Sequence, residues 1–354
     1  MSYTFAPEQA ENPHVTLGAL TGYLQSSIRP PEKISLAAYK AMTAAQQRSY
    51  NRDRDYYLDG SILLQTPQVV AANDAVEKMV RRNTRRADAP RPGLIISGPG
   101  SMGKTTITRT IMRSLYDSYA QQFPGFEQQN RHPVVYIEVP VTSTGKSLLK
   151  AFAHFFGITV ATRDTQESLM IRVTEALRAV KTELVVVDEI HNLSAANRGN
   201  GESIQTLRQL HSQVPAIFVY AGINLRDGHL FEGPTGRQLS GRFAIHEIQH
   251  FTLASAKQRS LWRALVRAFE KELLLFSHEP KSLDEFSDHL HDITGGSIAT
   301  LSKVLSGCAR DLIANNDPDN ESITLELIDA QLRDMAAADQ EKALTARTNR
   351  RKIA

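Results

Sequence analysis

Cysteine is nearly absent from this sequence: Cys308 is the only one in 354 residues. A single thiol cannot build an internal disulfide framework, which excludes a disulfide-stapled secreted domain and fits a reducing compartment. Long apolar runs are also missing, and none reaches the roughly 20 residues that a membrane-spanning helix needs. Residues 1–7 lack the basic and apolar regions of a secretion signal. We therefore expect a cytoplasmic protein that makes no membrane contact.

The sequence also has little excess charge of one sign. Its 41 Lys and Arg residues nearly balance 38 Asp and Glu residues, which gives a formal net charge of +3 and a pI of about 8.9. This balance permits contact with nucleic acid without requiring it. Hydrophobic residues make up 41% of the chain and charged residues 22%, as is typical of globular proteins. The length predicts roughly two domains.

The most specific motif is a phosphate-binding loop. Residues 98–106 match G-x-x-x-x-G-K-[ST] without a gap, between a short apolar run at 94–97 and a helical pattern over 106–113. The glycines let backbone N–H groups face the phosphates, and the helix N-terminus adds partial positive charge. Lys104 can reach the β- and γ-phosphates, and Thr105 can ligate Mg²⁺. The predicted nucleotide-binding residues are Gly98, Pro99, Gly100, Ser101, Met102, Gly103, Lys104, Thr105 and Thr106.

Two carboxylates, Asp188 and Glu189, directly follow an apolar run at 184–187. The carboxyl ends of the strands are where open α/β sheets bind their ligands. Asp188 is predicted to hold Mg²⁺, directly or through water, and Glu189 to orient and polarise the attacking water. An acidic pair after a strand also occurs as a helix cap, but a phosphate-binding loop in the same chain favours the catalytic interpretation.

Asn224 and two arginines complete the predicted site. Asn224 follows another apolar run, where a polar side chain can position water beside the γ-phosphate, although Asn is also common in turns. Arg237 and Arg242 precede the last predicted strand, and an arginine there could reach the γ-phosphate held by a neighbouring subunit. We favour Arg242 over Arg237, and a solvated loop is the alternative for either.

Strand and helix patterns alternate up to about residue 252, which predicts an α/β fold with a parallel sheet, and only helical patterns follow. The predicted strands lie at 94–97, 134–139, 184–187, 216–221 and within 244–248, and the predicted C-terminal helices at 255–275, 282–292, 297–315 and 324–338. We predict an N-terminal arm and helix (1–60), an α/β nucleotide-binding domain (61–252), an α-helical domain (253–340) and a basic, disordered tail (341–354).

Several other stretches have two interpretations. The polar composition of residues 1–30 predicts a flexible arm, which is the one interpretation that we give to this stretch. Residues 33–58 predict a helix with interleaved Arg and Tyr, which could bind nucleic acid or pack on its own domain. The arginines within 81–86 are either a solvated linker or a phosphate-facing patch. Residues 144–147 end like a phosphate-binding loop but lack its first glycine, so we reject them as a nucleotide site.

The ordered set of phosphate-binding loop, Asp188-Glu189, Asn224 and Arg242-Phe243, followed by a helical domain, resembles an AAA+ ATPase. More narrowly, roughly residues 60–335 resemble the TniB/TnsC family of transposition ATPases. The stretches on which this narrower resemblance depends are Val135–Pro140, Arg163–Thr165, Leu184–Leu193 and Thr294–Leu301.

The resemblance implies an AAA+ P-loop NTPase core, in which helices flank a parallel five-stranded sheet, with a C-terminal α-helical lid. It implies an ATP hydrolase that uses ATP and Mg²⁺ and assembles as a ring or helical filament on duplex DNA. The assembly would mark a target for a transposase, with a target-selector protein as a further partner, and hydrolysis would drive disassembly. In the family's terms, Gly98, Gly103, Lys104 and Thr105 take the Walker A roles, Asp188 and Glu189 the Walker B roles, Asn224 that of sensor 1 and Arg242 that of the arginine finger.

The sequence departs from the AAA+ pattern at the lid. Many AAA+ proteins have an arginine at the start of the lid helix, but Ala299-Thr300 stand there and Lys303 follows a turn later. A lid-borne positive charge on the γ-phosphate is therefore unsupported. No motif fixes DNA contacts. We choose Lys146 and Lys150, since members of the family contact DNA from loops at the inner face.

Other functions share the same nucleotide core. A signalling ATPase of the STAND or defence type would bind a protein partner instead of DNA, and a replication-type ATPase would act as a loader or bind origins. A scaffold that binds ATP and barely hydrolyses it is a third alternative, and Glu189 argues against it.

Overall fold

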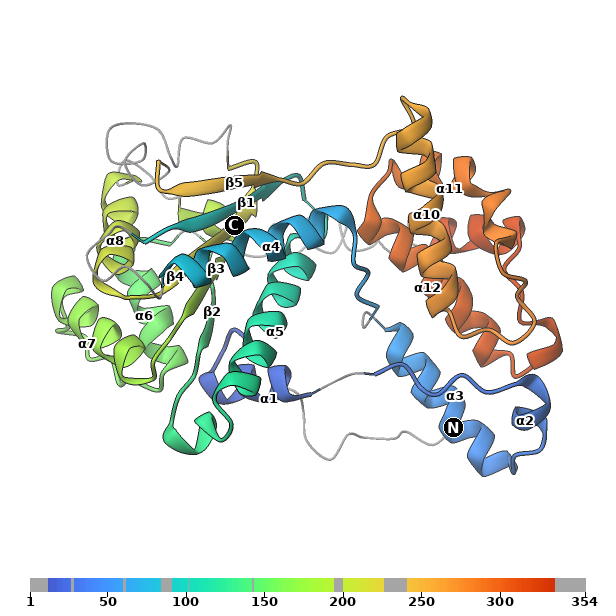
Figure 1. Ribbon diagram of the computed structural model, residues 1–354, viewed down its shortest axis with the longest axis horizontal. Coiled ribbons are helices and arrows are strands. Elements are labelled where there is room, and N and C mark those ends of the chain that lie inside the picture. The colour runs from blue at the N-terminus through green and yellow to red at the C-terminus, as the bar shows by residue number, and fades with distance from the viewer. Residues whose placement is uncertain are drawn as a thin grey trace, which may run out of the picture. The chain divides into compact units, whose positions relative to one another are not determined.

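The computed structural model describes residues 12–26, 29–59, 62–83, 91–100, 102–141, 143–193, 200–225 and 241–334. The chain forms two compact units, whose elements Figure 1 labels. Unit 1 comprises residues 1–27 and 65–249, and unit 2 comprises residues 28–64 and 250–354. Each unit therefore draws on two separate stretches of the chain.

Unit 1 is built around a five-stranded parallel sheet with the strand order β2-β3-β4-β1-β5. Its strands are β1 Gly93–Gly98, β2 Val134–Glu138, β3 Leu184–Asp188, β4 Ile217–Ile223 and β5 Phe243–Glu247. All five strands predicted from apolar runs are confirmed. Every residue of β1 and β3 is buried, as expected of strands that are covered on both faces.

Helices cover both faces of this sheet. They are α4 Pro67–Asn83, α5 Lys104–Gln122, α6 Gly145–Phe155, α7 Gln166–Ala179 and α8 Asn200–Gln213, with short 3₁₀ turns η1 Phe126–Gln129 and η2 Ile190–Leu193. Right-handed crossovers place α5 on one face and α6, α7 and α8 on the other. The contacts agree, since α4 packs on α5 and α6 packs on both α7 and α8.

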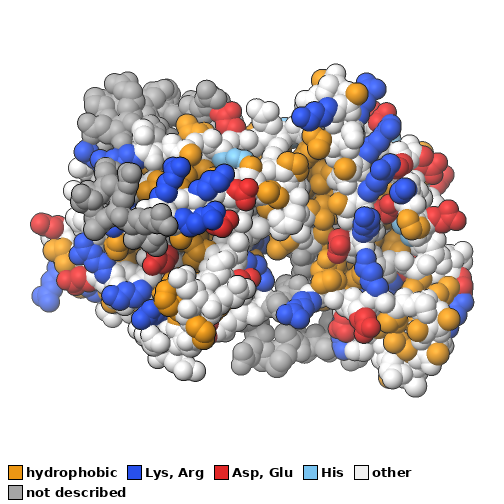
Figure 2. All heavy atoms as spheres, in the orientation of Figure 1, with side chains coloured by type: hydrophobic (Ala, Val, Ile, Leu, Met, Phe, Trp, Pro, Cys, Tyr) orange, Lys and Arg blue, Asp and Glu red, His pale blue; other side chains and the backbone are white. Residues whose placement is uncertain are grey.

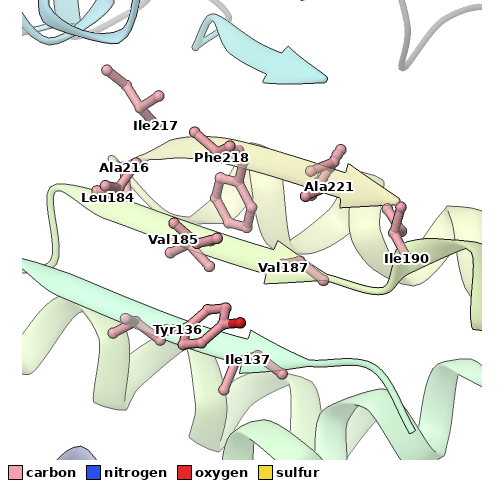
Figure 3. Packing of buried hydrophobic residues seen from close by; sticks show 14 of the residues in the cluster. Tyr136, Ile137, Leu184, Val185, Val187, Ile190, Ala216, Ile217, Phe218 and Ala221 are labelled. Atoms are coloured by element: carbon pink, nitrogen blue, oxygen red, sulfur yellow. The ribbon is translucent and has the colours of Figure 1, made fainter. Parts of the chain in front are cut away.

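The core of unit 1 is largely aliphatic. Figure 3 shows side chains of β2, β3 and β4 meeting between the strands and the flanking helices, among them Ile137, Val185, Val187 and Phe218. Each is almost completely buried. Burying an aliphatic or aromatic side chain of this size stabilises the fold by roughly 1.5–3 kcal/mol, so these strands form a rigid base for the loops at their ends.

Unit 2 is all-helical. Its elements are α2 Leu36–Lys40, α3 Ala44–Leu58, α10 Ala256–Glu272, η4 Ser282–Asp284, α11 Ser287–Thr294, α12 Ile298–Ala314, η5 Pro318–Asn320 and a helix at 325–334. They enclose a second apolar cluster around Trp262, which is fully buried. The predicted C-terminal helices at 255–275 and 297–315 are confirmed, and the one at 282–292 begins with a 3₁₀ turn. The one at 324–338 is confirmed as far as residue 334, and residues 335–338 lie outside the described part of the chain. Among the described residues, none of the helices combines the length and apolar character needed to cross a bilayer.

The prediction of a flexible arm over residues 1–30 is wrong for part of that stretch. Helix α1 spans Leu17–Gln25, and the Thr16 side chain caps it by accepting a hydrogen bond from the Ala19 N–H. Leu20 and Leu24, one helical turn apart, are buried in the core of unit 1. Two leucines among polar neighbours are too weak a periodic signal to predict this packing. Residues 1–11 lie outside the described part of the chain.

The helix predicted over residues 33–58 is two helices, α2 and α3, and both belong to unit 2. Arg54 in α3 has no exposed surface. Its guanidinium donates to both carboxylate oxygens of Glu321, at 2.7 and 2.8 Å, and its centre lies 4.6 Å from the centre of the Phe276 ring. The Arg–Tyr pattern therefore packs on its own unit at Arg54, and the predicted N-terminal region 1–60 is shared between the two units.

Candidate functional site

The phosphate-binding loop connects β1 to α5, as the motif requires. Gly103 has a φ of 82°, a left-handed conformation that favours glycine, and α5 begins at the next residue. A Cβ on Gly98 would lie 2.8 Å from the backbone oxygen of Ile248, so a larger residue would push the loop away from that backbone. Close approach thus favours glycine at Gly98, and backbone conformation favours it at Gly103. Ser101 lies outside the described residues.

Lys104 is buried at the first position of α5. Its Nζ donates hydrogen bonds to the backbone oxygens of Gly98, at 3.1 Å, and Pro99, at 2.5 Å. Burial lowers the pKa of Lys104, and the negative charges of Glu189 and Asp188 oppose that shift. A bound phosphate would offer this ammonium a charged acceptor in place of two neutral carbonyls, which is a stronger interaction.

Asp188, at the end of β3, lies against the loop and is only 2% exposed. Its Oδ2 accepts from the Thr105 hydroxyl at 3.3 Å and from the Tyr136 hydroxyl at 3.0 Å. Its Oδ1 accepts from the Glu189 N–H at 2.8 Å. Thr105 and Asp188, the two predicted metal ligands, are therefore brought together.

Glu189 is half-buried beside the loop and has a φ of 54°, which is uncommon for a residue with a side chain. Burial, and then the charge of Asp188, raise the pKa of the Glu189 carboxyl, while His191 and Lys104 oppose the shift. Its Oε2 lies 3.3 Å from His191 Nδ1. A small cavity joins this carboxylate to the loop; its lining residues are Gly100, Met102, Gly103, Lys104, Thr105, Glu189 and Ile223.

Asn224 directly follows β4 and is exposed, with a φ of 43°. Its N–H donates to the Gly98 oxygen at 3.2 Å, and the next N–H, that of Leu225, donates to Ser97 Oγ at 2.9 Å. These two bonds hold the end of β4 against the start of the loop. Asn224 therefore lies one residue from the cavity wall at Ile223.

Arg242 lies at the amino ends of the strands, whereas the phosphate-binding loop lies at their carboxyl ends. It is exposed immediately before β5, and its backbone oxygen accepts from the Gly93 N–H at 3.3 Å. Gly93 is the first residue of β1 and Gly98 the last, so Arg242 and the loop are separated by the length of a strand, about 16 Å. Arg242 is thus remote from the loop of its own chain. Arg237 lies outside the described residues.

Lys146 and Lys150 lie on the first turns of α6, where Lys150 is exposed. The Thr144 side chain accepts from the Ser147 N–H, and Ser147 Oγ accepts from the Thr144 N–H, which forms a capping box. Residues 144–147 are therefore a helix start in the structure. Figure 2 shows other Lys and Arg side chains over α4 and in a column along α10.

The residues at the loop fit a Mg²⁺ ion by the chemistry of their donors. Mg²⁺ prefers oxygen ligands and usually binds through one or two carboxylates, phosphates and water. Thr105 and Asp188 supply a hydroxyl and a carboxylate at one point. In the described part of the chain, no cluster of three or more His, Cys, Asp or Glu residues forms a complete metal cage, which such a phosphate-dependent site does not need.

Two residues of the site were not predicted. Tyr136 lies inside an apolar run that indicates only a strand, and His191 follows the acidic pair without a spacing that marks it. His191 Nδ1 lies near both Glu189 Oε2, at 3.3 Å, and the Ile223 N–H, at 3.4 Å. Contacts of this kind depend on the register of neighbouring strands, which a single sequence does not encode locally.

Comparisons with known proteins give a family and a fold. The family described as "Bacterial TniB protein" matches residues 62–253, more than half of the chain. No curated protein sequence matches the chain. Among solved structures, the Aeropyrum pernix ORC1 protein in complex with DNA has a TM-score of 0.58 and 13% identity, over 79% of this chain and 69% of that one. The Aeropyrum pernix ORC2 protein in ADPNP–ADP complexes has a TM-score of 0.57 and 15% identity, over 78% and 70%.

Proposed function

Because this chain belongs to the bacterial TniB family and has the fold of AAA+ ATPases, we propose that it is an ATP-dependent regulator of DNA transposition. The family and the fold support an ATP hydrolase. The observation that best supports the proposal is the meeting of Lys104, Thr105, Asp188 and Glu189 at one edge of the sheet. These are the residue types that phosphoryl transfer to water requires.

In the proposed complex, the loop holds the phosphates of ATP. Backbone N–H groups after Gly98 and the N-terminus of α5 face them, and Lys104 exchanges its two carbonyl partners for phosphate oxygens. Thr105 and Asp188 hold Mg²⁺, which when bound neutralises charge on the phosphates. The exposed loop residues Pro99 and Gly100 lie where a nucleotide can enter.

Glu189 is the proposed general base. A carboxylate can accept the proton of an attacking water, and the place of Glu189 on the cavity wall puts it beside the loop. Asn224, at the next strand end, would position the same water. The backbone bond from Asn224 to Gly98 couples the end of β4 to the loop that holds the nucleotide.

Arg242 is the proposed finger, and it acts on the ATP of a neighbouring protomer. Its place at the far edge of the sheet argues against action on its own site and suits a contact across a subunit boundary. ATP held between two protomers then favours assembly by as much as it binds the assembled state more tightly. Hydrolysis removes that preference, and the ring or filament disassembles.

The proposed partners are duplex DNA, a transposase and a target-selector protein. The family match favours transposition. The solved structure of Aeropyrum pernix ORC1 contains DNA, which is compatible with a DNA-bound assembly of this fold. Lys146 and Lys150 remain our proposed contacts to DNA phosphates, and we place the protein in the cytoplasm. Binding through such contacts weakens steeply as salt rises.

Electron microscopy with a non-hydrolysable ATP analogue, with and without duplex DNA, tests this function. We expect ordered rings or filaments only when both are present, and none with Lys104→Ala. Assembly that is unchanged by DNA but requires a protein partner would favour a signalling ATPase. Closed rings on DNA that recruit a helicase instead of a transposase would favour a replication-type loader.

A further inference from the structure

We propose that Tyr136 is a positioning residue for the metal-binding carboxylate, and that its hydroxyl holds Asp188 in the orientation that Mg²⁺ requires. The inference rests on the proposed role of Asp188 in holding the metal. The observation behind it is the hydrogen bond from the Tyr136 hydroxyl to Asp188 Oδ2, at 3.0 Å.

Tyr136 is a polar side chain inside an otherwise apolar part of the sheet. It lies on β2, is 3% exposed, and its neighbours on β3 are valines. Figure 3 shows Tyr136 on β2, with its hydroxyl oxygen directed toward the carboxyl ends of the strands. That is the edge of the sheet at which Asp188 and the phosphate-binding loop lie. A buried hydroxyl needs a partner, and Asp188 supplies it.

The position of the ring is fixed from a second side. His14, just before α1, meets the Tyr136 ring edge-on, with 6.1 Å between ring centres. His14 Nδ1 also lies 3.3 Å from the Glu138 carboxylate, at the end of the same strand. His14 thus contacts the ring of Tyr136, while the hydroxyl of the same ring donates to Asp188.

Asp188 Oδ2 accepts two hydrogen bonds, one from Tyr136 and one from Thr105, and the two differ in kind. Asp188 Oδ2 also accepts from Thr105, but that hydroxyl belongs to the loop and must share its oxygen with the metal. Tyr136 is anchored in the sheet and makes no contact that the nucleotide would replace.

Such a bond to a metal-binding side chain sets metal affinity more than the rate of the chemical step. Losing a partner of this kind typically weakens metal binding 10- to 100-fold. Tyr136→Phe removes the hydroxyl and keeps the ring. We expect the variant to need roughly tenfold more Mg²⁺ for half-maximal ATP turnover, with a rate at saturating Mg²⁺ close to that of the wild type and an unchanged affinity for ATP in EDTA.

Tyr220→Phe is the matched control. Tyr220 is a fully buried tyrosine on β4, and its hydroxyl has no hydrogen-bond partner among the described atoms. It should leave the Mg²⁺ dependence unchanged. As a readout independent of turnover, Mg²⁺ should raise the melting temperature of the ADP-bound protein at lower concentration in the wild type than in Tyr136→Phe.

Two results would overturn the inference: an unchanged Mg²⁺ requirement in Tyr136→Phe, or a lower rate at every Mg²⁺ concentration without a shift in the midpoint. A shift of equal size in Tyr220→Phe would also overturn it, because the effect would then be one of packing. If the wild type turns over ATP without any divalent ion, the proposed metal role of Asp188 fails, which is a distinct outcome.

Discussion

At the scale of single residues, the site combines buried charge with uncommon backbone conformations. Glu189 and Asn224 follow neighbouring strands, and both have left-handed φ values, of 54° and 43°. Such conformations cost roughly 1–3 kcal/mol for residues with side chains and persist where the surroundings enforce them. At these two positions the Glu189 N–H donates to the Asp188 carboxylate and the Asn224 N–H donates to the Gly98 backbone oxygen. Both residues adjoin the loop: Glu189 lines the small cavity beside it, and the Asn224 N–H donates to the Gly98 oxygen.

Glu189→Gln should separate nucleotide binding from hydrolysis. Gln has nearly the same shape, but its amide cannot take a proton from water, so we expect ATP turnover to fall by roughly 10²- to 10⁴-fold while ATP still binds. Lys104→Ala is the control, because losing the buried ammonium should abolish ATP binding itself. Turnover and binding of a fluorescent ATP analogue measure the two effects. Equal turnover in wild type and Glu189→Gln would refute the assignment.

His211 in α8 predicts a pH dependence of stability. Its ring packs on Phe218 and Phe243, with centroid distances of 5.2 and 5.0 Å, and burial, then the charge of Arg242, lower its pKa from 6.5 to about 4. The unfolded chain therefore binds this proton more readily, so stability falls as pH drops from about 6.5 toward 4.

His211→Phe should remove that loss. Between pH 7 and 4.5 the free energy of unfolding of the wild type should fall by about 2 kcal/mol more than that of the variant. Denaturant titrations at the two pH values measure the difference. His154→Asn, at an exposed position of α6, should retain the wild-type slope. Parallel slopes in wild type and His211→Phe would contradict the prediction.

At the scale of elements, the strands were predictable and the N-terminal helices were only partly so. Uninterrupted apolar runs such as Leu184–Val187 fit a strand covered on both faces, and the alternation of such runs with helical patterns favoured a parallel sheet. Helix α1 depends on two leucines, and the division of α1 and α3 between the units depends on long-range packing. No local pattern specifies which unit a helix joins.

Helix α3 should depend on Arg54 for its place in unit 2. Removing one partner of a buried ion pair leaves the other charged and unpaired, so Arg54→Ala should destabilise unit 2 by about 3–5 kcal/mol. Arg310→Ala is the matched control: its pairs with Asp55 and Asp59 are largely exposed, so the loss should be about 1 kcal/mol or less. Urea unfolding of both variants gives the comparison. Similar losses in the free energy of unfolding of the two variants would contradict the prediction, because the cost of breaking an ion pair would then not depend on its burial.

In the candidate site, too, some residues could be predicted from the sequence and others could not. Lys104, Asp188 and Glu189 could be predicted because a contiguous motif and a strand end fix both residue type and place. Tyr136 and His191 could not, since their roles arise from the register that sets Glu138 beside Asp188 and from the turn after β3. The roles of all these residues remain predictions, and Arg237 and Ser101 also lie outside the described residues.

At the scale of the whole molecule, the proposed function requires two copies of the chain to complete one hydrolytic site. The loop and the acidic residues lie at the carboxyl edge of the sheet, while Arg242 lies at its amino edge. A head-to-tail contact between protomers brings the two edges together, and such contacts generate rings or helical filaments. In the proposed assembly, one interface would therefore support both assembly and hydrolysis.

Mixing two inactive variants tests this claim most directly. Arg242→Ala keeps an intact loop and base, and Glu189→Gln keeps an intact arginine, so each should turn over little ATP alone. Mixed in equal amounts before ATP and DNA are added, they should recover about a quarter of the wild-type rate. Half of the protomers then have an intact base, and half of those meet a neighbour with Arg242. No recovery on mixing, or wild-type turnover by Arg242→Ala alone, would contradict the account.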